Sequence, residues 1–181
     1  DLHLCDRRQR QMCIRDRIYT SKKKDDMLWP DMTWMFILAY DVWNFQYTYL
    51  NLPTHSWYCG VALLLAPTFA AAFWNKGGWI QNRANTLALW CMFAQVFPLF
   101  QDQGKFAVIP RLYADGFMDA ATHPTAVDPT AQGVISVLSI VVNVVVFAAI
   151  IKRSMKLKKN PYKDEIWKGT KDYEEAMSRA E

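Results

Sequence analysis

Residues Gly133–Ile151 read GVISVLSIVVNVVVFAAII and contain no charged side chain. A helix that crosses the hydrocarbon core of a membrane needs about 20 apolar residues. Valine and isoleucine favour strands, but strands seldom exceed about ten residues, so the length of this run predicts a helix. We expect this helix to span a membrane. The alternative is a long core helix in a soluble helical domain.

Three other apolar runs precede this one, in a chain with 52% hydrophobic and 14% aromatic residues. The second run carries no charge and is bounded by Trp57 and Trp74, as interface anchors would bound a span. The first run is the weakest prediction because it contains Asp41. We expect an all-α transmembrane helical bundle with four spans, at about 33–52, 57–74, 80–100 and 133–151.

Basic residues indicate the orientation of these spans. Five of them follow the last run at once, namely Lys152, Arg153, Lys156, Lys158 and Lys159. An excess of Lys and Arg marks the cytoplasmic side of a span. Counting back through four spans places Lys22–Lys24 and the loop 75–84 on the same side. We therefore expect the C-terminus to be cytoplasmic.

The N-terminal segment Arg7–Arg17, RRQRQMCIRDR, has a different origin in our interpretation. Residues 1–17 resemble the conceptual translation of a transposase-type sequencing adapter, read in one frame. We expect them to be non-native and disordered, and we leave them out of fold reasoning. Without their five Arg and three Asp, the net charge falls from +4 to about +2. The rest would then be a C-terminal fragment of a larger membrane protein.

Polar side chains within the apolar runs are the candidate site. Asp41, Asn44 and Thr48 are spaced i, i+3, i+7 and share one helical face. A charged Asp at membrane depth costs about 3 kcal/mol and normally faces a bundle interior or a water-filled cavity. The candidates for a substrate or ion pathway are Asp41, Asn44, Gln95 and Asn143. The alternative is that these groups form hydrogen bonds that only fix helix packing.

Other chemically active residues give weaker signals. His55 and His123 are isolated histidines and are the weaker site candidates. We expect no metal site, because the acidic residues and His123 of the loop 101–131 match no ligand template. Pro67 is expected to kink the second span, with the Thr68 hydroxyl compensating a freed backbone group.

The stretches AYDVWNFQYTY (Ala39–Tyr49, preceded by Trp34) and HSWYCGVALLLAPTFAA (His55–Ala72) are distinctive. Residues 18–181 resemble a bacterial multi-spanning membrane protein family of unknown function. The resemblance implies a bacterial cytoplasmic (inner) membrane protein with further helices upstream, and it supplies no catalytic residues. We expect residues 18–151 to form a transmembrane helical domain and 152–181 a cytoplasmic basic tail containing a short helix.

Three functions are compatible with these patterns. The leading hypothesis is a transport or small-molecule-binding helical bundle with polar groups facing inward. The alternatives are a membrane-embedded enzyme and a structural or assembly subunit. We expect no cofactor and no nucleic-acid partner. The expected partners are the lipid bilayer and the upstream helices, and a homo-oligomer stays open.

Overall fold

The computed structural model describes residues 17–51, 61–97 and 129–180. Within these residues it contains five helices and a small antiparallel hairpin. The elements are β1 (Tyr19–Thr20), β2 (Met27–Leu28), α2 (Trp34–Asn51), α3 (Leu63–Phe73), α4 (Trp79–Val96), α5 (Pro129–Leu157) and α6 (Lys171–Arg179). The all-α fold class that the sequence predicts is confirmed.

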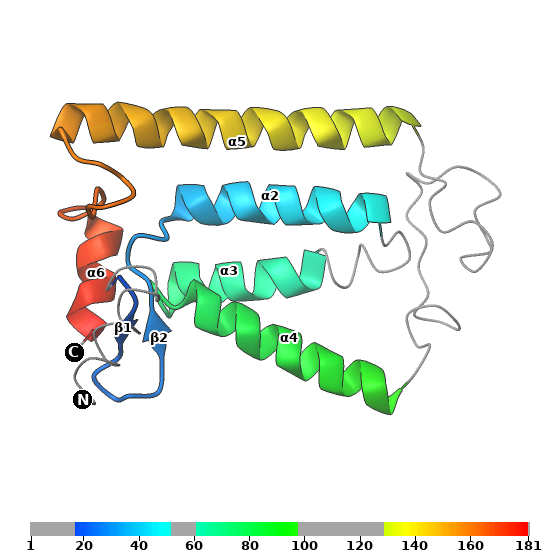
Figure 1. Ribbon diagram of the computed structural model, residues 1–181. Coiled ribbons are helices and arrows are strands. Elements are labelled where there is room, and N and C mark those ends of the chain that lie inside the picture. The colour runs from blue at the N-terminus through cyan, green and yellow to red at the C-terminus, as the bar shows by residue number, and fades with distance from the viewer. Residues whose placement is uncertain (1–16, 52–60, 98–128, 181) are drawn as a thin grey trace, which may run out of the picture.

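Four helices lie side by side in the order α5, α2, α3 and α4 (Figure 1). The most extensive contacts join α3 to α4 and α2 to α5, while a smaller contact joins α2 to α3. Helices α2 and α4 begin at the end of the molecule that holds α6 and the hairpin, and α3 and α5 finish there (Figure 1). The four helices therefore alternate in direction, and we call them the helix layer.

Proline and glycine shape the middle of the helix layer. Pro67 lies inside α3, where it removes one backbone hydrogen bond, and its side chain is fully buried. The turn at residues 61–62, just before α3, is π-helical. After α3, the chain reverses through Gly77, whose φ of +80° suits glycine. A Cβ atom at Gly77 would lie 2.7 Å from the Cβ of Ala176, so α6 packs directly on this turn.

The second unit, which we call the end cap, consists of residues 17–32, 74–78 and 158–180. In its hairpin Tyr19 pairs with Leu28 and Thr20 with Met27. The next residue along, Ser21, forms a backbone bridge with Ala180. The buried side chains of the cap include Leu28, Ile166, Tyr173, Ala176 and Ala180. The cap thus brings the start and the end of the described chain together.

Hydrogen bonds and an ion pair hold the three segments of the end cap together. The Arg179 guanidinium pairs with Asp26 at 2.9 Å, donates to the Lys76 carbonyl at 3.1 Å and also donates to the Asn75 side chain. The backbone N–H of Trp29 donates to the Gly77 carbonyl at 2.7 Å. Three segments distant in sequence therefore converge on one turn.

Arg17, the last residue of the segment that we interpret as adapter-derived, also contacts the cap. Its guanidinium pairs with Asp31 at 3.3 Å and donates to the Pro161 carbonyl at 3.1 Å. Residues 1–16 lie outside the described residues. The non-native origin of residues 1–17 stays a prediction.

Among the described residues, one helix is long and apolar enough to cross a membrane, namely Thr130–Leu157 in α5. The expected count of four spans is therefore not supported by length and composition. α3 has only 11 residues in its described part. α2 carries Asp41 and Asn44 within its 18 residues, and α4 includes the polar stretch Gln81–Arg83 near its start.

Apolar side chains cover much of the outside of the helix layer. Only 11% of the most apolar window of α5 is buried within the molecule. Exposed large apolar residues also occur on each of the other three layer helices, for example Trp43 on α2, Phe69 on α3 and Leu89 on α4. A soluble monomer rarely exposes so much contiguous apolar surface, so this surface calls for an apolar environment or a partner.

Candidate functional site

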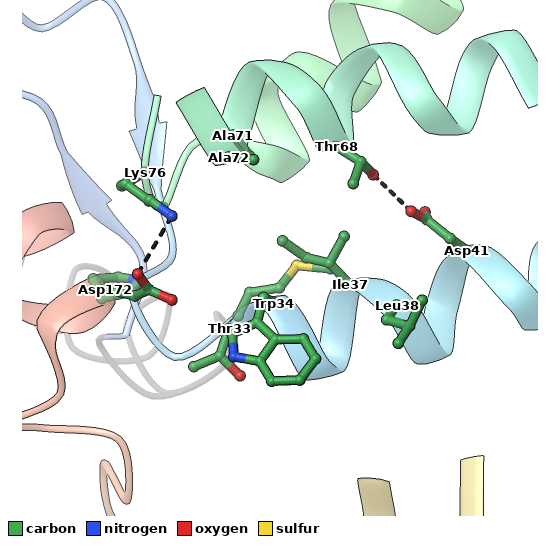
Figure 2. Close-up of a pocket in the computed structure, with 13 residues that line it drawn as sticks. Thr33, Trp34, Ile37, Leu38, Asp41, Thr68, Ala71, Ala72, Lys76 and Asp172 are labelled. Carbon is green, nitrogen blue, oxygen red and sulfur yellow. Dashed lines mark hydrogen bonds and ion pairs between the residues drawn. The ribbon is translucent and has the colours of Figure 1, made fainter. Parts of the chain in front are cut away.

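A cavity of about 240 Å³ lies between α2, α3 and the end cap. Figure 2 shows its two ends, each marked by a polar contact: Asp41 with Thr68 at one end and Lys76 with Asp172 at the other. The walls between them are mostly apolar. They include Ile37 and Leu38 from α2, and Ala71 and Ala72 from α3.

A chain of hydrogen bonds fixes the inner end of this cavity. The indole N–H of Trp79 donates to Thr68 Oγ1 at 2.9 Å, and the Thr68 hydroxyl donates to Asp41 Oδ2 at 2.6 Å. These residues belong to α4, α3 and α2 respectively, so the chain ties three helices at one point. The Tyr40 ring reinforces it with an edge contact to Trp79, with centroids 5.0 Å apart.

The hydrogen bond of the Thr68 hydroxyl differs from the one that the sequence predicts. We expected it to compensate a backbone group freed by Pro67. In the structure its donor goes to Asp41, a residue 27 positions away. The partner of Asp41 was missed because nothing in the local pattern of either helix pairs an aspartate with this threonine.

The second oxygen of Asp41 has no partner. Its Oδ1 atom is buried and accepts no hydrogen bond within the described part of the chain. An unsatisfied buried acceptor costs about 1–3 kcal/mol, and a charged one costs more. Among the sequence candidates that the structure describes, Asp41 alone combines a cavity wall with an unmade hydrogen bond.

Arg83 is a charged residue that the sequence reasoning assigned to a loop. It lies on α4 one turn after Trp79, and its charge acts on the Asp41 carboxylate. Its Nε and Nη1 atoms are buried without hydrogen-bond partners among the described residues. Asp41 and Arg83 are therefore opposite charges that each have a buried atom without a hydrogen bond among the described residues.

The outer end of the cavity lies at the end cap. Lys76, in the turn after α3, pairs with Asp172 of α6 at 3.3 Å (Figure 2). Both side chains are partly exposed, so this pair is in contact with solvent. The cavity therefore runs from a solvated ion pair to a more buried carboxylate.

Asn143 lies at a separate place, between α2 and α5. Its side-chain amide donates to the Ser139 carbonyl at 2.9 Å and to the Ala39 carbonyl at 3.4 Å. It lines a second cavity of about 220 Å³ together with aromatic residues such as Tyr40 and Trp43. The bond to Ala39 joins α5 to α2, which is the packing role that the alternative interpretation assigns to such residues.

Of the remaining sequence candidates, the two that the structure describes, Asn44 and Gln95, do not line the Asp41 cavity. Asn44 is partly buried on α2, and its backbone carbonyl accepts from the Thr48 hydroxyl at 3.0 Å. Gln95 is exposed near the far end of α4. His55 and His123 lie outside the described residues. Within the described residues, no group of three His, Cys, Asp or Glu side chains could hold a metal ion.

Ionisable groups inside the end cap are coupled to one carboxylate. The Tyr19 hydroxyl donates to Glu165 at 2.7 Å. Burial, together with the nearby Glu165, raises the pKa of Tyr173 well above its ordinary value. The same two causes raise the pKa of Tyr19. This cluster joins the hairpin to α6 and keeps Asp172 at the mouth of the cavity.

Comparison with known proteins identifies a family and no close relative of known role. Residues 11–179 match the model of a family of unknown function, DUF5692. The match begins inside the segment that we interpret as adapter-derived. No curated protein and no solved structure matches the chain.

Proposed function

We propose that this chain, which belongs to the family of unknown function DUF5692, is a helical membrane protein. In this proposal it binds a small molecule in the cavity between α2 and α3. The observation that carries this proposal is that Asp41, at the inner end of a mostly apolar cavity, has an Oδ1 atom with no hydrogen-bond partner among the described residues. Binding sites of this kind combine apolar walls with a few placed polar groups.

The exposed apolar surface supports a membrane location. Water would hydrate the outer faces of α4 and α5 at a large cost in free energy, whereas lipid tails would cover them at little cost. The 18 residues of α2 and of α4 each give a length of about 27 Å, close to the roughly 30 Å of a hydrocarbon core. All four layer helices are then spans in our proposal.

Basic residues support one orientation. Lys22–Lys24, Lys76 and the lysines after α5 all belong to the end of the molecule that holds the cap (Figure 1). The positive-inside rule assigns such an end to the cytoplasm. We therefore propose a bacterial inner-membrane protein whose cap faces the cytoplasm and whose cavity opens beside the cap.

The shape and polarity of the cavity define the class of ligand. A volume of about 240 Å³ lies just below the usual range for drug-sized ligands, so the ligand is small. Asp41 Oδ1 requires a hydrogen-bond donor, and the walls require a short apolar body. Small primary amines and alcohols meet both conditions, and the same site would serve a transporter.

The test uses the full chain in lipid nanodiscs with a panel of small amines and alcohols. We expect at least one compound to raise the thermal unfolding temperature of the wild type. Asp41→Ala should weaken its binding about 10–150-fold, because a hydrogen bond to a charged group is worth about 1.5–3 kcal/mol. Asn44→Ala, on the same helix but off the cavity wall, is the matched control.

A second variant guards against loss of folding in Asp41→Ala. Thr68→Val keeps the size of the side chain and removes the hydroxyl that donates to Asp41. If a ligand binds Asp41→Ala and Thr68→Val as tightly as the wild type, the site is elsewhere. Uptake of the same compound into proteoliposomes would distinguish transport from binding alone.

A further inference from the structure

The segment that follows the apolar part of α5 is basic without any acidic residue. Residues 152–163 contain no Asp or Glu. We use the name basic platform for Lys152, Lys156, Lys158, Lys159 and Lys163 of this segment. Among the described residues, no ion pair joins a platform lysine to a carboxylate. Its positive charge is therefore not neutralised within the described part of the molecule.

Arg153 holds the platform in place instead of adding to it. Its Nε–H donates to the Ile166 carbonyl at 2.6 Å, and its guanidinium lies 4.8 Å from the centre of the Trp167 ring. The chain after α5 therefore turns back toward the cap, as the orange segment of Figure 1 shows. The left-handed Lys158, with φ of +52°, ends the helix just before this turn.

The nearby acidic side chains are occupied by other partners. Asp164 accepts from the Asn160 backbone N–H at 2.9 Å, and Glu165 accepts from the Tyr19 hydroxyl at 2.7 Å. Both bonds tie these carboxylates to the backbone or to the cap. The Asp164 and Glu165 carboxylates therefore stabilise the loop and the cap, and they do not pair with the platform lysines.

Exposed apolar residues alternate with the platform lysines. Met155 and Leu157 are exposed beside Lys156, and the Tyr162 side chain is 74% exposed beside Lys163. A surface that bound only a soluble polyanion would not need exposed apolar side chains such as Met155, Leu157 and Tyr162. Long lysine stems and aromatic rings of this kind are typical of the boundary between lipid tails and headgroups.

We infer that the basic platform binds the headgroups of anionic phospholipids. Four or more basic residues directly after a membrane span, combined with exposed apolar side chains, fit a negatively charged headgroup beside a hydrocarbon tail. This inference rests on the proposed membrane location, because only that location brings the end of α5 to the headgroup level.

The test titrates the detergent-solubilised full chain with phosphatidylglycerol or phosphatidylcholine, and native mass spectrometry counts the bound lipid. Each lysine near an anionic surface contributes about fivefold. The triple variant Lys156→Gln, Lys158→Gln, Lys159→Gln should therefore weaken phosphatidylglycerol binding about 100-fold. The matched control removes the same charge at the same end of the molecule through Lys22→Gln, Lys23→Gln and Lys24→Gln, with little expected effect.

Three outcomes would overturn the inference. They are equal binding of the two lipids by the wild type, an equal loss in both triple variants, and full competition by glycerol phosphate, which would indicate a site for free anions. If the platform triple variant does not fold, single Lys→Gln variants with a fivefold loss each replace it. Extraction of the wild type from membranes by carbonate would instead contradict the proposed function.

Discussion

The helix layer and the end cap differ in where their apolar and charged side chains lie. In the cap, the arginine at position 179 pairs with Asp26 and the turn after α3, and the buried side chains lie inside the unit. In the layer, large apolar side chains point outward along all four helices. The cap is organised like a small water-soluble protein, and the layer is not.

In the proposed membrane location, this difference corresponds to two solvents for one chain. Each unit would be unstable in the environment of the other, because lipid would leave the cap charges without hydration and water would leave the layer apolar surface uncovered. The boundary runs through the residues next to Lys76 and at the end of α5. The cavity that ends at Asp41 opens at this boundary.

The largest effect is expected from placing a charge on the outside of the layer. Val144 is 60% exposed on α5. Val144→Lys should cost about 2.5–3.5 kcal/mol of insertion free energy, because lipid cannot solvate the ammonium group at mid-span. Membrane insertion measured with a glycosylation reporter gives this value directly.

The matched change in the cap is Met27→Lys, at a residue that is 36% exposed on the hairpin. It should change the free energy of unfolding by no more than about 0.5 kcal/mol, because water covers that position. A harmless Val144→Lys would place the layer in water and remove the distinction between the two units.

The next effect is expected inside the cap, where the turn after α3 meets α6. Gly77→Ala would force a side chain into the left-handed region and onto Ala176. We expect a loss of at least about 2 kcal/mol, because backbone strain of about 1–2 kcal/mol adds to an overpacking cost of about 1–3 kcal/mol. Thermal unfolding in nanodiscs measures the change.

Gly169→Ala separates the two contributions. Gly169 has φ of +85°, but no atom lies within 4 Å of the place where its Cβ would stand. This variant should show only the strain of about 1–2 kcal/mol. Equal losses at Gly77 and Gly169 would mean that the close contact between the turn and α6 does not form.

The smallest effect is a pH dependence that belongs to the cap alone. Burial raises the pKa of Tyr173 above its ordinary value of 10.0, so the folded cap keeps the proton that the unfolded chain releases. Stability is therefore full below about pH 10 and falls as the pH rises further. Tyr173→Phe should flatten this decline, and the double variant with Tyr19→Phe should flatten it more.

Urea unfolding of the cap at pH 8 and at pH 11, followed by hydrogen exchange of α6, measures the decline. The layer helices should show no such change when the two tyrosines are replaced. Parallel losses in the wild type and the double variant would contradict the role of the cluster around Glu165.

The sequence predicted the parts of the fold that depend on local pattern. The length of the Val- and Ile-rich run defined α5, although the helix extends from Pro129 to Leu157, beyond the run itself. The spacing of Asp41, Asn44 and Thr48 identified one face of α2, and Asp41 lines a cavity. These features depend on the nearest residues along the chain, so they can be read without the tertiary structure.

The end cap could not be predicted in this way. Its hairpin strands have two residues each, and Ser21 pairs with Ala180 at the other end of the chain. The bond from Thr68 to Asp41 and the burial of Arg83 also depend on how separate helices meet. The sequence also predicted four spans, whereas one helix among the described residues is long and apolar enough to cross a membrane. The difference arises partly because polar residues interrupt α2 and α4.

The pairing of Ser21 with Ala180 has a consequence for biosynthesis. The hairpin leaves the ribosome while α6, which begins at Lys171, is still more than a hundred codons away. At about 5–20 residues per second, the first half of the cap waits on the order of ten seconds for the second. During that interval the hairpin can already contact the turn after α3, through the bond from the Trp29 N–H to the Gly77 carbonyl, but it lacks α6. The backbone pairing of Ser21 with Ala180 therefore forms only after α6 has been synthesised, which makes it a late step in the folding of the cap.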